Sequence, residues 1–214
     1  MISISHPSAS AGARWPGIAS AAIVPDAAWR ATRPAPEIAV PTWRQGWSLR
    51  DGRCVQVRAP HAPDVPRLAS FFAALAPLSR RHRFHGAVNR IPDDVLRTMI
   101  EIDPRRQLAV VVETVFEAPA ATVSPLVAEA RLAFDADRGE GEFALAVADD
   151  WQGAGLGSRL LNLLSRQARA LGLDTLVGRV EDDNDAMLAL LRGAGAVIRR
   201  DRDERSVLLA RIEP

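Results

Sequence analysis

A glycine-rich segment is the part of this chain whose residue types and spacing best suit a chemical task. Residues 149–158 read DDWQGAGLGS and lie between an apolar strand pattern and a long amphipathic helix pattern. Gly153, Gly155 and Gly157 let backbone N–H groups approach a ligand closely, because no Cβ stands in the way. The helix expected to begin here adds unpaired N–H groups and the positive end of its dipole. The segment therefore predicts an anion site that suits phosphate, and a purely structural tight turn is the alternative.

Several phosphate-binding and amine-dependent classes are excluded. The dinucleotide fingerprint GxGxxG does not fit, because the glycine after Gly155 is Gly157 and position 158 is serine. All 27 basic residues are arginine, and the chain has neither lysine nor tyrosine. A Walker A loop, a pyridoxal Schiff base and a kinase strand lysine each need the missing amine.

The strand pattern before the glycines has one bulky face and one small face. In residues 142–148, EFALAVA, alternation places Phe143, Leu145 and Val147 on one face. Glu142 and three alanines share the other face. That strip of methyl groups with a carboxylate at its end leaves space for a ligand or for a closely packed helix.

Strands and helices alternate along the part of the chain that positions these residues. Strands are expected over residues 54–58, 108–112, 127–134, 142–148, 175–181, 196–199 and 206–212. Helices are expected after Asp64 as N-cap and over residues 92–100, 155–171 and 186–192. This order predicts one α/β domain with a mixed sheet over residues 48–214.

Residues 1–47 differ in composition from the rest. They are rich in Ala, Pro and Ser, show no sustained period, and hold four of the five tryptophans. We expect a disordered extension, loosely packed or docked on the domain or a partner; an organelle transit peptide and an overlong gene start fit as well.

Composition gives no reason to expect nucleic acid or a membrane as a partner. The net charge is +1, no run of about 18 apolar residues occurs, and the N-terminus lacks a secretory pattern. The default expectation is a cytoplasmic protein of unknown oligomeric state. A disulfide within the chain is impossible because Cys54 is the single cysteine.

Two phrases resemble the signatures of the GNAT acetyltransferases. Gln152, Gly155 and Gly157 match the pyrophosphate loop Q/R-x-x-G-x-G/A, between the expected strand and helix. Residues 184–195 are similar to the second signature, N-x-x-M-x-x-L with a trailing glycine. The resemblance covers about residues 48–212. It implies a mixed, mostly antiparallel central sheet flanked by helices.

Within this superfamily, the chain looks most like the GNAT domain of Pat-type protein lysine acetyltransferases. The looser supporting phrases are LRDG at 49–52, RF at 83–84, EFA at 142–144, WQG at 151–153 and VGRV at 177–180. The resemblance implies acetyl-CoA as acyl donor and a protein amine, such as a lysine of an acetyl-CoA synthetase, as acceptor.

The same resemblance implies which residues bind and react. Acetyl-CoA is expected where the central strand diverges from its neighbour. The residues expected to bind it are Leu145, Ala146, Val147, Gln152, Gly153, Ala154, Gly155, Leu156, Gly157, Ser158 and Asn184. Glu142 matches the glutamate that Pat-type enzymes use as general base, and an acceptor ammonium with a pKa near 10.4 must lose a proton before attack. An ordinary strand-end carboxylate is the alternative. With no tyrosine to protonate the leaving thiolate, water is expected to do so.

Other reactive side chains are expected to be structural or to lie at the acceptor cleft. Glu113 and Glu129 are weaker candidates for the base. His82 and His85 stand among arginines that repel cations, so no metal site is predicted, and their segment lines the acceptor cleft or forms a solvated basic face. Cys54 is expected to be a small buried hydrophobe.

Three functions remain open at this point. The first is acetyl transfer to a protein lysine, the second is the same chemistry on a small amine, and the third is a non-catalytic acyl-CoA-binding module. Acceptor loops carry no portable motif, so the sequence separates the first two poorly.

Overall fold

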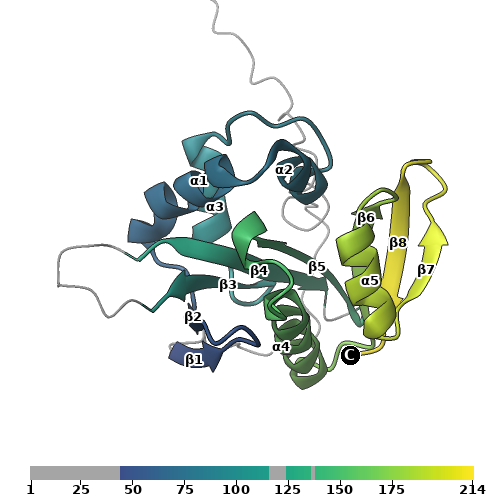
Figure 1. Cartoon of the computed structure of the whole chain (residues 1–214). Coiled ribbons are helices and arrows are strands. Elements are labelled where there is room, and N and C mark those ends of the chain that lie inside the picture. Colours follow the sequence, from purple (N-terminus) through teal and green to yellow (C-terminus); the bar gives the residue numbers. More distant parts are fainter. Residues whose placement is uncertain (1–43, 116–123, 136–137) are drawn as a thin grey trace, which may run out of the picture.

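The computed structural model describes residues 44–115, 124–135 and 138–214, in which eight strands form one sheet (Figure 1). The strands are β1 (Arg44–Ser48), β2 (Cys54–Arg58), β3 (Gln107–Thr114), β4 (Leu126–Asp135), β5 (Glu140–Val147), β6 (Thr175–Glu181), β7 (Val197–Arg200) and β8 (Val207–Ile212). Their order is β1-β2-β3-β4-β5-β6-β8-β7, and only β5 and β6 are parallel neighbours. The expected mixed, mostly antiparallel sheet is confirmed.

Helices cover both faces of this sheet. They are α1 (Val65–Ala74), α2 (Pro77–Phe84), α3 (Asp93–Ile100), α4 (Leu156–Ala170) and α5 (Asp185–Gly193). Figure 1 places α1, α2 and α3 on one face and α4 on the other. The buried leucines of α5 belong to the same core cluster as those of α4, so α5 covers the α4 face beside β6. No helix of the described residues is long and apolar enough to cross a membrane.

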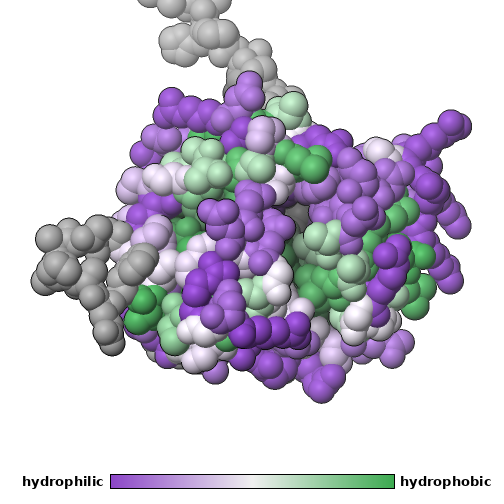
Figure 2. Space-filling view, in the orientation of Figure 1, coloured by the Kyte–Doolittle hydropathy of each residue, from purple (hydrophilic) through white to green (hydrophobic). Residues whose placement is uncertain are grey.

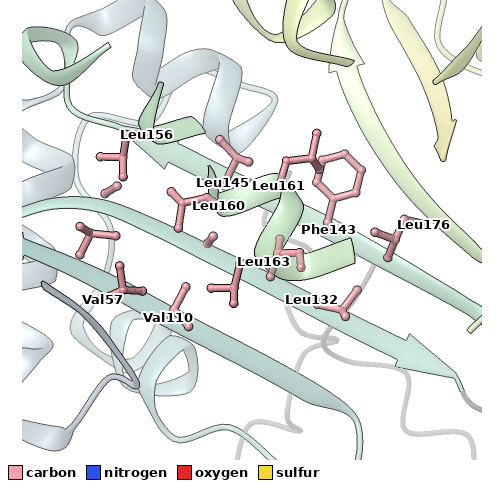
Figure 3. Packing of buried hydrophobic residues seen from close by; sticks show 14 of the residues in the cluster. Val57, Val110, Leu132, Phe143, Leu145, Leu156, Leu160, Leu161, Leu163 and Leu176 are labelled. Carbon is pink, nitrogen blue, oxygen red and sulfur yellow. The ribbon is translucent and has the colours of Figure 1, made fainter. Parts of the chain in front are cut away.

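Two hydrophobic clusters hold the layers together. On one face, Leu156, Leu160 and Leu161 of α4 pack against Phe143 and Leu145 of β5 (Figure 3). On the other face, α1, α2 and α3 form a second cluster with Phe72 and Phe84 at its centre. Each fully buried leucine or phenylalanine stabilises the fold by about 1.5–3 kcal/mol. Ala146 belongs to the second cluster, as the alternation along β5 predicts.

The first hairpin corrects the expected domain boundary. The strand β1 begins at Arg44, so the last four residues of the expected extension 1–47 pair with β2 instead. Trp47 is buried in the core and is not part of a loose tail. The other three N-terminal tryptophans lie outside the described residues. The expected turn is present, with Gly52 at φ +85°.

Three local expectations were wrong or incomplete. The helix α2 was not predicted, because its sequence PLSRRHRF is short and half of it is arginine or histidine. Asp64 does not cap α1 with its side chain. Its carboxylate pairs with Arg58 and Arg67, which satisfy it more strongly than a helix N–H would. Cys54 is exposed rather than buried, because it faces solvent near the sheet edge.

Candidate active site

A cleft opens where β5 and β6 diverge. Their pairing covers three residues and ends at Glu142, opposite Val177, whereas β6 stays paired with β8 as far as Glu181. The ring of Phe143 lies against Gly178, where a Cβ would come within 2.5 Å of the ring. Gly178 therefore lets Phe143 pack at the point of divergence. Figure 2 shows the surface hollowed in this region, between hydrophilic and hydrophobic side chains.

The cleft is a cavity of about 850 Å³ that reaches from the glycine-rich segment to α2. Most of its lining comes from β5, the β5–α4 turn, the start of α4, α2, β6 and the start of α5, and single residues come from the β1–β2 turn, the α1–α2 connection and the β7–β8 loop. The lining includes Arg50, Leu75, Ser79, His82, Arg83, His85, Glu142, Leu145, Ala146, Val147, Gln152, Gly153, Gly155, Gly157, Ser158, Arg179, Asp183, Asn184, Met187 and Glu204.

At one end, the glycine-rich segment has the geometry of an anion cradle. Gly153 and Gly155 adopt φ values of +77° and +87°, the left-handed region that favours glycine. Gly155 is the N-cap of α4 and has no side chain, so no capping side chain among the described residues occupies the first N–H groups of the helix. Gln152 donates from Nε2 to the carbonyl of Val147 at 3.1 Å, which fixes the turn to the end of β5.

The β1–β2 hairpin packs against this cradle and brings an arginine to it. The N–H of Arg50 donates to the carbonyl of Ala154 at 3.3 Å. Arg53 donates to the carbonyl of Asp150 at 3.0 Å, and its guanidinium lies 4.0 Å from the centre of the Trp151 ring. The Arg50 side chain lies beside Gly155, where a Cβ would be 3.2 Å from Nε. A cation and a helix N-terminus therefore meet at one place, which suits a phosphate.

At the other end, α2 spans the cleft and is held at both of its ends. The carboxylate of Asp149 accepts hydrogen bonds from Ala76 N–H at 2.8 Å and from the Ser79 hydroxyl at 2.5 Å. Near the C-terminal end, Arg81 pairs with Glu181 and with Asp183. These contacts join α2 to the segment after β6, across the gap that β5 and β6 leave.

His82 lies in the same ionic cluster. Its Nε2 is 2.9 Å from a carboxylate oxygen of Asp183, and the ligand atoms of His82, Glu181 and Asp183 lie within 4.8 Å of one another. The fold thus supplies the carboxylates that were not found near His82 in the sequence. The guanidinium of Arg81 already binds both of them, so the cluster is an ion-pair network rather than a site prepared for a cation.

The scan against protein families decides the identity of this fold. The model of the acetyltransferase (GNAT) family matches residues 87–196. The chain belongs to the GNAT acetyltransferase family. GNAT enzymes use acetyl-CoA as their donor, and the cradle of glycines, helix N-terminus and Arg50 fits its pyrophosphate.

Individual relatives agree with this family. A protein of Pseudomonas aeruginosa named as an acetyltransferase is 30% identical over 165 residues, which is 77% of this chain and 87% of that protein. The GNAT domain of S. lividans PAT matches with a TM-score of 0.70 at 23% identity, over 80% of this chain and 97% of that one. Spermidine N-acetyltransferase of Vibrio cholerae, solved with CoA and spermine, matches with a TM-score of 0.58 at 18% identity, over 73% of this chain and 92% of that one. The last two likenesses show the fold.

Most of the donor residues expected from the sequence line the GNAT cleft. The side chains of Ala154 and Leu156 are buried in the core under the turn, and their expected contribution is their backbone N–H groups. Asn184 lines the cleft, but its Oδ1 accepts from Met187 N–H at 3.1 Å and caps α5. Arg50 was missed, since nothing in the sequence indicates that the hairpin reaches the glycine-rich segment.

The alternative carboxylates of this GNAT fold have structural roles. Glu129 is buried, and although burial raises its pKa, the guanidiniums of Arg83 and Arg131 outweigh that and hold the pKa below its usual range. Glu113 is held in the same way by Arg58 and Arg67. Both were expected to be structural, and Glu142 is the glutamate that lines the cleft on β5.

Proposed function

We propose that this GNAT acetyltransferase moves the acetyl group of acetyl-CoA to the side-chain amine of a protein lysine, with Glu142 as general base. One observation carries the proposal. Glu142 is the last residue of β5 that pairs with β6, and it shares a cavity with the glycine-rich cradle. A carboxylate therefore stands at the point where a donor bound along β5 would meet an acceptor.

The donor is proposed to lie along β5 and the turn that follows it. The backbone of residues 145–147 lies beyond the last β5–β6 pair and can hold the extended pantetheine arm by strand-like hydrogen bonds. The N–H groups of residues 153–158 and the guanidinium of Arg50 are proposed to bind the pyrophosphate. Asn184 has an amide nitrogen left for the arm, since its oxygen caps α5.

The reaction needs one proton removed from the acceptor before attack. Glu142 accepts a proton from the lysine ammonium, and the freed amine attacks the thioester carbonyl carbon. A C–N bond forms, the C–S bond breaks, and the second amine proton is released as the amide forms. The coenzyme A thiolate leaves and takes a proton from water, because the chain has no tyrosine for that role.

Two observations bear on the nature of the acceptor. The sequence phrases that resemble Pat-type protein lysine acetyltransferases support a protein acceptor, and an acetyl-CoA synthetase is the first candidate. The likeness to the spermidine enzyme supports the alternative of a small amine. The cleft lies at the surface between α2 and β6, which suits a lysine side chain that enters from outside.

The test is release of free CoA from acetyl-CoA with purified acetyl-CoA synthetase, beside a panel of small amines. Acetylation of a synthetase lysine supports the proposal. Turnover with free amines alone would mean that the acceptor is a small amine and not a protein. Binding of acetyl-CoA with no turnover on either set supports a non-catalytic acyl-CoA module.

The role of Glu142 is tested with Glu142→Gln. We expect turnover to fall by about 10²–10⁴-fold while acetyl-CoA affinity stays the same. Glu140→Gln is the matched control, because Glu140 lies two residues earlier on β5 and pairs with Arg211 at the surface. Equal turnover of Glu142→Gln and the native protein would remove Glu142 from the mechanism.

A further inference from the structure

His85 occupies a backbone position that a histidine adopts at a cost. It follows α2 with φ +50° and ψ +41°, and it is the single non-glycine residue with positive φ among the described residues. Its N–H donates to the carbonyl of Arg81 and closes the helix. Glycine is the favoured residue at such a helix end, because a Cβ strains the left-handed conformation. Helix termination therefore does not account for a histidine here.

The described part of the fold does not provide a hydrogen bond for the buried ring nitrogen of His85. Its Nδ1 is buried and has no hydrogen-bond partner among the described residues. A buried polar atom without a partner is destabilising. The ring nevertheless lines the cleft that also holds Glu142. Because Nδ1 is closed to solvent, a ligand in the cleft can reach the ring only through its other nitrogen, Nε2. Backbone strain at a cavity wall is a feature that gathers at binding sites.

The surroundings of His85 keep its ring uncharged at neutral pH. Burial and the guanidiniums of Arg179 and Arg83 lower the pKa of His85 to about 4, against a smaller opposite effect of Glu204. Both arginines are engaged elsewhere: Arg179 with Asp201 and Glu204, and Arg83 with Glu129. A neutral imidazole has one nitrogen that accepts a hydrogen bond, whereas an imidazolium would repel an acceptor ammonium.

Arg179 relates His85 to the expected reaction centre. Glu142 pairs with Val177, and Arg179 is the next residue of β6 on the same face, about 7 Å further along the strand. Arg179 and His85 line the same cavity, and Arg179 is near enough to lower the pKa of His85. An amine that gives one proton to Glu142 keeps further N–H groups that can point toward α2.

From this arrangement we infer that His85 is a catalytic residue that holds the acceptor, with its neutral imidazole accepting a hydrogen bond from the amine that Glu142 deprotonates. The inference rests on the proposed function and adds a second contact on the acceptor side. It explains why this position carries a histidine rather than the glycine that the helix end favours.

The test uses a bisubstrate probe, in which an acetyl bridge joins the sulfur of CoA to the ε-nitrogen of a lysine peptide. The affinities of CoA and of the probe are compared in the native protein, His85→Gly and His85→Asn. Both replacements tolerate the left-handed backbone. We expect unchanged or higher melting temperatures and unchanged CoA affinity. The affinity ratio of probe to CoA, which we call the gain, falls about tenfold in His85→Gly. It falls less in His85→Asn, whose amide oxygen also accepts a hydrogen bond.

Each other outcome has a definite meaning. An unchanged gain in His85→Gly overturns the inference, and so does a lower melting temperature with equal loss of CoA and probe affinity, which marks a structural role. A native protein that binds the probe no tighter than CoA overturns both this inference and the proposed acceptor site. If Glu142→Gln keeps full turnover and His85→Gly has a reduced affinity gain, Glu142 is not the general base, and the contact of His85 with the acceptor stands. His61→Asn is the control, because His61 is exposed and lies outside the cavity.

Discussion

The two ends of the cleft are built in different ways. The donor end consists mainly of residues 145–158, a single strand–turn–helix segment with glycines and backbone N–H groups, and other elements add Arg50 and Asn184. The acceptor end consists of side chains from α2, β5, β6 and the β7–β8 loop, which are as far apart in the chain as Ser79 and Glu204. Backbone geometry over a short stretch thus serves the donor, while tertiary packing serves the acceptor. Substitutions at the donor end should therefore change acetyl-CoA affinity, and substitutions at the acceptor end should change acceptor binding.

At the donor end, the largest effect on binding is expected for Gly155→Ala. The residue has φ +87°, and a Cβ would lie 3.2 Å from Nε of Arg50. Alanine strains the left-handed backbone by about 1–2 kcal/mol and pushes Arg50 aside, so the cradle changes shape. We expect acetyl-CoA affinity, measured by calorimetry, to fall at least about tenfold, with a stability loss of about 1 kcal/mol.

Gly172→Ala is the control that distinguishes backbone strain from a loss of the donor site. Gly172 also has a left-handed backbone, at φ +72°, but it lies at the far end of α4 with nothing near its Cβ position. A similar loss of stability with native donor affinity is expected. If both variants bind acetyl-CoA normally, the donor does not use the cradle.

A smaller effect on the same end is expected for Arg50→Gln. Loss of one charge-assisted contact to a phosphate at an exposed site should weaken acetyl-CoA binding about fivefold, with little change in stability. Because salt screens exposed charges, the difference from the native protein should shrink as ionic strength rises. Arg44→Gln is the control on the same hairpin, since Arg44 contacts Gln56 instead. Equal affinity of native protein and Arg50→Gln at low salt would place the phosphates elsewhere.

The donor end was predictable because its signals are local. Glycine spacing, the apolar strand before it and the amphipathic helix after it occupy adjacent positions, and the structure places β5, the turn and α4 within one or two residues of the expected ranges. The order of strands and helices predicted the fold in the same way. At Ala154 and Leu156 the motif concerns the backbone N–H groups alone, because their side chains belong to the core.

The acceptor end was not predictable because its residues meet only in three dimensions. The segment of His82 and His85 was expected to line the acceptor cleft or to form a solvated basic face, and it does line the cleft. The helix α2 itself was missed, because its sequence has no apolar period. Asp183 and His82 are about one hundred residues apart, and their contact depends on the β5–β6 divergence. The boundary at residue 47 failed for a related reason, since Trp47 is apolar enough for the core but stands in an Ala- and Pro-rich context.

The low pKa of His85 is expected to make the stability of the folded protein depend on pH. Between pH 6.5 and 4, the unfolded chain protonates this histidine and the folded chain does not, so stability falls as pH falls through that window. The native protein should lose on the order of 1 kcal/mol more than His85→Asn between pH 7 and 5, since solvent partly screens the ring. The carboxylates with lowered pKa act below that range, because they are ionised in both states above about pH 5. If the melting temperatures of the two proteins change with pH in the same way, the pKa of His85 is not lowered by folding.

The smallest effect is expected for Asp183→Asn, which loosens the contact between α2 and the segment after β6. Asp183 is exposed, and its ion pairs with Arg81 and His82 are open to solvent, so the melting temperature should change by no more than about 1 °C. The acceptor KM should rise roughly twofold and the acetyl-CoA affinity should stay the same. Asp182→Asn is the matched control, since Asp182 is the exposed neighbour that pairs with Arg200 instead. A tenfold or larger rise in acceptor KM would instead show that this ion pair sets the width of the cleft, and that the acceptor end is as rigidly organised as the donor end.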